Sequence, residues 1–244
     1  MSDPDDETAE PIGSGRTCNP MPARSGTLAL GGALGNTLSM GIYRSRVLPH
    51  LMNAAMSSDE NREIRARVCS DLEGTVVEIG FGSGLNVPYY PTGVQTVHAV
   101  EPLLRSVALA SERIAASHVD VRHTGLNGER LDFPSESADA VLSTWTLCSI
   151  PDVETALAEI RRILKPGGTL HFVEHGISPE AKVARRQGRI EPITKPILGG
   201  CHLTRDIPAL IARAGFVTET MTAYQHPKEP KIFGWTFEGR AGLA

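Results

Sequence analysis

The chain has little of what would assign it to a nucleic-acid-binding class. Only 5% of its 244 residues are aromatic, and its formal net charge is −4, from 24 basic and 28 acidic side chains. Binding to nucleic acid usually needs a basic surface, and binding to single strands also needs aromatic side chains that stack on bases. We therefore expect no nucleic-acid partner.

Cysteine is equally scarce. The chain has four cysteines, Cys18, Cys69, Cys148 and Cys201, which lie far apart and form no CxxC pair. Metal-binding and disulfide-rich domains usually show closely spaced pairs, so we expect neither a metal site nor a disulfide framework. Cys148 and Cys201 are instead expected to be small buried apolar fillers. This cysteine usage is typical of a reducing, cytoplasmic location.

Long hydrophobic runs are also missing. The most apolar stretch, residues 27–43, contains four glycines and is shorter than the ~20 residues that a membrane-spanning helix needs. Residues 1–25 are rich in acidic residues, proline, glycine and serine. That composition is typical of a disordered tail and unlike a secretory signal peptide. These features favour a soluble protein.

Short apolar runs alternate with helical stretches from Thr75 onward, which predicts βαβ units, an α/β fold and a mostly parallel sheet. The clearest helix covers residues 152–164, with Asp152 able to cap it and one apolar stripe along its length. Lys165-Pro166-Gly167-Gly168 should end it, with glycines at positive φ in the turn. Seven strands are predicted, at 75–80, 96–101, 119–123, 139–144, 168–174, 216–223 and 231–238.

Residues 26–70 predict helices, because apolar residues recur at helical spacing around Leu48 and Ile64. We expect this segment to form a lid over a ligand site in the domain made by residues 71–244. An insertion at 176–205 should help to form the acceptor site. Its basic stretch, residues 182–195, leaves two interpretations open, a solvated helix face and a peripheral contact with phospholipid headgroups.

The most informative segment runs from Thr75 to Gly84, where a β-branched run leads into glycines at alternate positions. Such glycines let the chain turn tightly beside a ligand, and an acid ending the next strand, here Glu101, can bind ribose hydroxyls. A dinucleotide fingerprint would place its third glycine where Leu85 stands. The observed spacing resembles motif I of the class I S-adenosylmethionine-dependent methyltransferases.

Later segments follow the same family order: Val100-Glu101-Pro102, residues 139–143 and residues 161–168. Shorter segments at 146–150, 172–175, 200–205 and 232–234 are similar to the thiol S-methyltransferase group and its bacterial relatives. The resemblance implies a Rossmann-like fold with an N-terminal helical lid. It also implies S-adenosylmethionine as the cofactor and S-adenosylhomocysteine as its product.

The resemblance further implies a set of cofactor-binding residues. Asn127 stands where the family usually has an acid facing adenine, and its amide oxygen can still accept a hydrogen bond. Glu129 and Asp132 are alternatives for that role, and buried packing is an alternative for Trp145. The full set is Glu78, Gly80, Gly82, Gly84, Glu101, Pro102, Asn127, Gly128, Ser143, Thr144 and Trp145.

Methyl transfer from a sulfonium is an in-line displacement with a neutral leaving group, so the enzyme mainly aligns its reactants. Alignment of this kind contributes about 7–11 kcal/mol. His175 and His202 are the candidate catalytic bases. The alternative for His175 is a structural hydrogen bond, and the alternative for His202 is a cap on the helix that follows it. Arg205 either holds a helix or binds an acidic substrate group. No catalytic metal is required.

The leading hypothesis is a methyltransferase acting on a small, largely apolar acceptor, and the subgroup resemblance favours a thiol. One alternative is N- or C-methylation of a phospholipid amine or a quinone. Two others come from different classes, a cofactor-binding scaffold without catalysis and a nicotinamide-dependent oxidoreductase.

Overall fold

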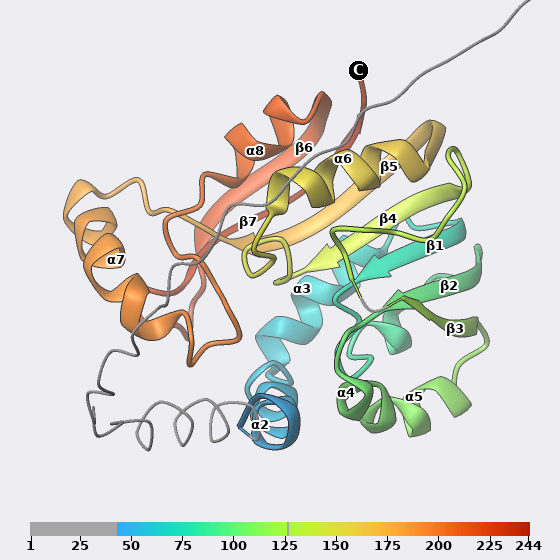
Figure 1. The fold of residues 1–244 in the computed structure, drawn as a ribbon, viewed down its shortest axis with the longest axis horizontal. Helices are drawn as coiled ribbons and strands as arrows, with labels where there is room; N and C mark the ends of the chain where they lie inside the picture. The colour runs from blue at the N-terminus through green and yellow to red at the C-terminus, as the bar shows by residue number, and fades with distance from the viewer. Residues whose placement is uncertain (1–42, 126) are drawn as a thin grey trace, which may run out of the picture.

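The computed structural model describes residues 43–125 and 127–244, so the predicted tail at 1–25 and the first part of the predicted lid lie outside it. The described residues form a seven-stranded sheet in the order β3-β2-β1-β4-β5-β7-β6, with helices on both faces (Figure 1). β1 to β5 are parallel, and β7 runs antiparallel to both β5 and β6. The predicted α/β class with a mostly parallel sheet is confirmed.

All seven predicted strands are present. They are β1 (Gly74–Ile79), β2 (Val94–Val100), β3 (Asp120–Gly125), β4 (Ala138–Thr144), β5 (Leu164–His175), β6 (Phe216–Gln225) and β7 (Trp235–Leu243). The predicted start of the last strand at 231 is wrong. The amides of Phe233 and Gly234 both donate to the carbonyl of Pro230, at 2.8 and 3.1 Å, so a turn occupies these positions.

The helices are η1 (Tyr43–Val47), α2 (Leu48–Ala55), α3 (Asp59–Cys69), η2 (Val87–Tyr89), α4 (Leu104–Leu109), α5 (Ser111–Ala115), α6 (Val153–Ile163), α7 (Ala181–Thr194) and α8 (Ile207–Arg213). The prediction for α6 is confirmed, because Asp152 caps it by accepting a hydrogen bond from the amide of Thr155 at 3.0 Å. No helix among the described residues combines the length and apolar character needed to cross a bilayer.

The segment Lys165–Gly168 ends α6 as predicted, but it does so inside a strand. β5 begins at Leu164, and its pairing with β4 skips from Leu164 to Thr169, so residues 165–168 bulge out of the ladder. Gly167 has φ +81°, whereas Gly168 does not adopt positive φ. Lys165 pairs with Asp139 at 2.6 Å across the bulge.

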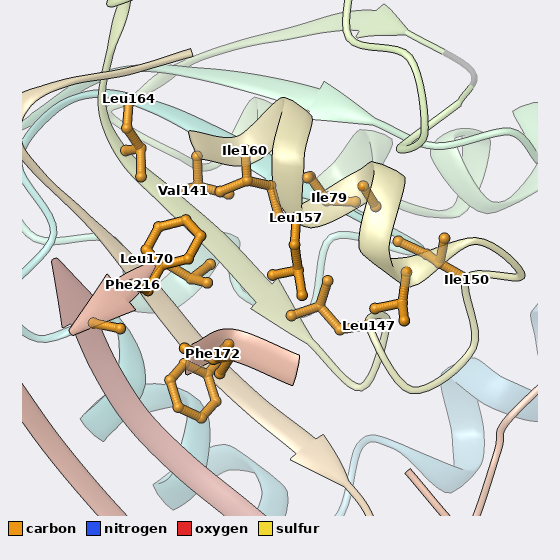
Figure 2. Close-up of a cluster of buried hydrophobic side chains, with 14 of the residues drawn as sticks. Ile79, Val141, Leu147, Ile150, Leu157, Ile160, Leu164, Leu170, Phe172 and Phe216 are labelled. Carbon is orange, nitrogen blue, oxygen red and sulfur yellow. The ribbon is translucent and has the colours of Figure 1, made fainter. Parts of the chain in front are cut away.

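Two hydrophobic layers enclose the sheet. Side chains alternate along each strand, so Val77 and Ile79 of β1 pack with α6 and α8, whereas Val76 packs with α3 on the opposite face. Figure 2 shows the first layer, in which Leu157 and Ile160 project from α6 toward the sheet. This packing holds the strand ends, and the loops that follow them, in fixed positions.

Helix α3 belongs to the second layer, where it buries Ile64, Val68 and Cys69. Arg67 anchors it to β7 through an ion pair with Glu238 at 2.9 Å. α2 precedes α3 and lies beside α4 (Figure 1).

Candidate functional site

A cavity of about 370 Å³ lies at the carboxyl ends of the central strands. It is lined by the residues that end β1, β2 and β4, by the segment after β3, and by α2 and α3. Open parallel sheets bind their ligands at this edge, and small-molecule pockets typically measure roughly 300–1,000 Å³. The cavity therefore has the place and the size of a ligand site.

The glycine segment after β1 forms one wall, and its three glycines do different things. All three have positive φ, at +73° for Gly80, +56° for Gly82 and +71° for Gly84. A Cβ on Gly80 would lie 2.0 Å from Thr146 Oγ1, and one on Gly84 would lie 2.8 Å from the Cβ of Ala110. A Cβ on Gly82 would come within 4 Å only of the Gly80 carbonyl oxygen, at 3.8 Å.

Gly82 therefore faces open space in the cavity, where a ligand can approach the main chain. Gly80 also lines the cavity, but Gly84 does not. Gly84 is required for packing rather than for contact with a ligand. Of the three glycines in this segment, the structure thus brings two to the cavity.

Glu101 lies at the end of β2 and holds the glycine segment. Its carboxylate accepts hydrogen bonds from the amides of Gly82 (2.9 Å) and Leu103 (2.8 Å). Burial raises the pKa of Glu101, while the two amide donors oppose that rise. Because Glu101 and the neighbouring Pro102 both line the cavity, a fixed acceptor stands where the sequence places one.

The segment after β3 lines the cavity through Asn127, Gly128 and Glu129, whereas Asp132 does not line it. The side-chain oxygen of Asn127 accepts a hydrogen bond from the amide of Glu129 at 2.8 Å. Glu129 in turn accepts from the amide of Asp152 at 2.9 Å. These bonds shape the turn, and they leave the second lone pair of the Asn127 oxygen for a further donor.

Arg65 of α3 is a cavity residue that the sequence reasoning missed. Its side chain is buried, and Nη1 donates to Asn86 Oδ1 (2.6 Å) and Thr144 Oγ1 (3.2 Å). Its Nε has no hydrogen-bond partner among the described residues. Burial lowers the pKa of Arg65 to about 10, so the group stays charged at neutral pH. A buried cation with an unused donor on a cavity wall fits a carboxylate ligand.

Glu78 and Ser143, two predicted cofactor residues, lie behind the cavity wall instead of on it. Glu78 accepts hydrogen bonds from Asn86 Nδ2, at 2.9 Å, and from the Tyr90 hydroxyl. Burial raises its pKa to about 7 despite these donors. Asn86 also accepts a hydrogen bond from Arg65, so Glu78 holds the cavity residue Arg65 in place through Asn86.

Trp145 follows β4, lines the cavity and has φ +52°, a region that few residues other than glycine adopt. Its indole nitrogen is buried without a hydrogen-bond partner among the described residues. Strain of this kind costs of order 1–3 kcal/mol and persists only where the surroundings enforce it. Trp145 and its neighbour Thr144 therefore reach the cavity as predicted, in a conformation that the sequence did not indicate.

Glu174 and Arg205 enforce that conformation by holding the loop between β4 and α6, residues 145–152. The Glu174 carboxylate accepts from the Ser143 hydroxyl and from the amides of residues 146, 147 and 148, at 2.7–3.1 Å. Arg205 donates to the carbonyls of Leu147, Ile150 and Pro151. Arg205 thus holds this loop rather than a helix, and its side chain does not line the cavity.

Neither candidate histidine lines the cavity. His202 Nδ1 lies 3.2 Å from Glu191 Oε1. Burial lowers the pKa of His202, and the positive charges of Arg205 and Lys195 lower it further. His175 lies behind Trp145, with ring centres 6.3 Å apart. Burial lowers the pKa of His175, but Cys148 and Glu229 outweigh it and raise the pKa to about 10. Both histidines thus make contacts of the structural kind.

Cys148 and Cys201 are buried, as predicted, but they are not isolated. Their sulfurs lie 3.6 Å apart, next to His175. The wide spacing in the chain gave no sign of this group. Along α7 the basic side chains of residues 182, 185, 186 and 189 are exposed, which suits a solvated face; a lipid contact there stays a prediction.

The architecture and the cavity define a class I, Rossmann-like methyltransferase, and comparisons with known proteins agree. A family model described as a methyltransferase domain matches residues 77–172. Among solved structures, a possible histamine N-methyltransferase from Thermotoga maritima has a TM-score of 0.60 at 22% identity, covering 84% of this chain and 100% of that one. A geranyl diphosphate methyltransferase in complex with SAM has a TM-score of 0.57 at 15% identity, covering 75% and 84%.

Among curated proteins, thiol S-methyltransferase TMT1B of Rattus norvegicus is 35% identical over 185 residues, which is 69% of this chain and 71% of the relative. A phosphatidylethanolamine N-methyltransferase of Cereibacter sphaeroides is 28% identical over 129 residues, which is 51% of this chain and 58% of that relative. The chain belongs to the S-adenosylmethionine-dependent methyltransferase family, in the group that includes the thiol S-methyltransferases. It is an enzyme, not a nicotinamide-dependent oxidoreductase, and its cofactor is S-adenosylmethionine.

Proposed function

We propose that the enzyme methylates a small, largely apolar thiol. The observation that carries this proposal is the apolar character of one part of the cavity wall. That wall comes from α2 and from the segment after α7, and it presents Leu48, Pro49, Met52, Met56 and Leu198. An apolar acceptor bound there would bury its surface against these side chains, which favours binding. The similarity to thiol S-methyltransferases supports the choice of atom.

The same residues suggest how S-adenosylmethionine is held. Glu101 would accept from the ribose hydroxyls, and the unused Nε of Arg65 would face the methionine carboxylate. Asn127 and Gly128 would contact the adenine, and Gly82 would let the main chain approach closely. When bound, this cofactor supplies a methyl group activated on a positively charged sulfur.

The few ionisable side chains on the cavity wall also favour a thiol, because a thiol needs little help from a base. Among the described lining residues these are Arg65, Glu101 and Glu129. A thiol with a pKa of about 8.5 is partly ionised at neutral pH and needs little help to become a nucleophile, whereas a phenol or an amine more often needs a nearby base. We propose that the wall around Trp145 aligns the sulfur, and that alignment and exclusion of water do most of the catalytic work.

The sharpest test varies only the nucleophilic atom. Thiophenol, phenol and aniline share one ring, so their rates of methylation by the full chain compare sulfur, oxygen and nitrogen in the same pocket. Transfer of a labelled methyl group should be fastest to thiophenol. Phosphatidylethanolamine and a hydroxylated quinone serve as the competing acceptors. Turnover of either lipid acceptor without turnover of any thiol would overturn the proposal.

A further inference from the structure

Three potential metal ligands meet next to the cavity, although they come from distant parts of the chain. Cys148 lies in the loop after β4, His175 ends β5, and Cys201 follows α7. The two sulfurs are 3.6 Å apart, and Cys201 Sγ lies 3.9 Å from His175 Nδ1. All three ligand atoms lie within 4.8 Å of one another.

These separations suit a tetrahedral zinc ion. With bonds of about 2.3 Å to sulfur and 2.0–2.1 Å to nitrogen, two sulfurs on one ion lie ~3.8 Å apart and a sulfur and a nitrogen ~3.5 Å apart. The sulfur pair already has nearly this spacing. The remaining separation, between Cys148 Sγ and the His175 ring, is bounded only by the 4.8 Å that encloses the group, so the imidazole would move by up to about an ångström to complete the tetrahedron.

Glu229 is placed to orient His175, as a carboxylate beside a metal-binding histidine usually is. Its Oε2 lies 3.3 Å from His175 Nε2, on the ring edge opposite the cysteines. Histidines that bind metals usually present their second nitrogen to a carboxylate, which fixes the tautomer and the ring orientation. Here that arrangement turns Nδ1 of His175 toward the two sulfurs, where its lone pair becomes available once an incoming ion displaces the Nδ1 proton.

The cysteines are also held in place by the backbone. The amide of His202 donates to the Cys148 carbonyl at 2.8 Å, and the Cys148 amide donates to Glu174 at 2.9 Å. Gly200 lies so close to Ser149 that a Cβ on Gly200 would be 3.0 Å from the carbonyl oxygen of Ser149. A site whose ligands are already positioned does not have to order them when the ion binds.

We propose that Cys148, Cys201 and His175 bind one Zn²⁺ ion, with Glu229 orienting the histidine. Thiolate and imidazole are the ligand types that zinc prefers. The ion would replace the two thiol protons and the Nδ1 proton of the charged His175, and all three protons pass to solvent, so two thiolates balance its charge in this buried site. Three protein ligands leave a fourth position open. The site would tie the cavity loop of Trp145 to the segment after α7, whatever the acceptor is.

Zinc content gives the first test. The full chain, purified in reductant and equilibrated with Zn²⁺, should retain one zinc ion per chain against a chromophoric chelator. Cys148→Ala and Cys201→Ala should lose it, and Glu229→Gln should weaken zinc binding by about 10–100-fold, the range for outer partners. Cys69→Ala is the matched control, because Cys69 is an equally buried thiol of α3 outside the group, and it should retain the ion.

Cobalt gives a second test that needs no variant. Co²⁺ bound to the reduced wild-type chain should show intense thiolate-to-cobalt charge-transfer absorption, which Zn²⁺ then abolishes. Absence of this absorption in the reduced, folded chain would overturn the proposal. So would zinc binding in Cys148→Ala and Cys201→Ala equal to that of the wild type. If those variants do not fold, the cobalt spectrum and Glu229→Gln still decide.

Discussion

The guanidinium of Arg65 lies 4.8 Å from the centre of the Trp145 ring, so a buried cation of α3 stacks on an aromatic side chain that follows β4. The two residues lie far apart in the chain and share the cavity wall. Each also carries a buried nitrogen without a hydrogen-bond partner among the described residues. A buried nitrogen without a hydrogen-bond partner is costly, so these two nitrogens indicate that a polar group of a ligand binds at this part of the cavity wall.

Replacing Arg65 should therefore weaken cofactor binding. Arg65→Met keeps much of the side-chain length but removes the charge. It should weaken the binding free energy of S-adenosylmethionine by about 1.5–3 kcal/mol, the range for hydrogen bonds to charged groups. Isothermal titration calorimetry measures this change. Arg62→Met is the control, because Arg62 lies on the same helix with an exposed side chain. Equal affinities in the two variants would contradict the assignment.

Gly82 and Gly84 form a matched pair for the glycine segment. Both have positive φ, so an alanine at either site carries a similar backbone cost of roughly 1–2 kcal/mol. The added methyl group at Gly82 enters the cavity, whereas at Gly84 it meets Ala110 at 2.8 Å. Gly82→Ala should lose cofactor affinity with a modest loss of stability, and Gly84→Ala should lose stability more strongly.

Titration calorimetry and urea unfolding, applied to both variants, separate these effects. The expected pattern is a larger fall in affinity for Gly82→Ala and a larger fall in the free energy of unfolding for Gly84→Ala. The reverse pattern would show that the two glycines have been assigned the wrong roles.

Glu78 should make stability depend on pH. Its pKa rises from 4.5 to about 7 on folding, chiefly because it is buried. Between these values the folded chain holds a proton that the unfolded chain has released, so the free energy of unfolding falls as pH rises. Below this window Glu78 is neutral in both states, and above it the loss is complete.

Glu78→Gln lacks this titration, so its stability relative to the wild type should increase by about 3 kcal/mol across the window, at about 1.4 kcal/mol per unit of pKa shift. Urea unfolding at constant ionic strength, between about pH 4.5 and 7.5, measures the difference between the two proteins. Parallel stability curves would show that the Glu78 pKa is not raised. A constant offset between the curves would reflect only altered hydrogen bonds.

Arg205 should stabilise the loop that carries Trp145. Arg205→Met removes donors to three loop carbonyls and should lower the free energy of unfolding by about 1.5–3 kcal/mol. The acceptor KM should rise as well, because this loop lines the cavity. Arg213→Met is the control, since the Arg213 side chain is 60% exposed and its ion pair with Glu154 spans 3.5 Å. An unchanged KM together with lower stability would restrict Arg205 to the fold.

The parts of the site that could be predicted from the sequence are those made by neighbours in the chain. Glu101 follows β2 directly and Gly82 comes three residues after β1, so their positions at the sheet edge follow from the order of the elements. Asp152 caps α6 for the same local reason. The start of β7 was misplaced because the turn at Pro230 contains apolar residues that imitate a strand.

The remaining contacts join residues that no short pattern connects. Arg65 reaches Thr144 across 79 positions, Arg205 reaches Leu147 across 58, and Cys201 meets Cys148 across 53. The sequence by itself determined the α/β class and the glycine turn, because strand alternation and tight turns depend on residues close in the chain. Only the tertiary structure decided which charged, aromatic and thiol side chains surround the cavity, because packing of the two layers brings distant segments together.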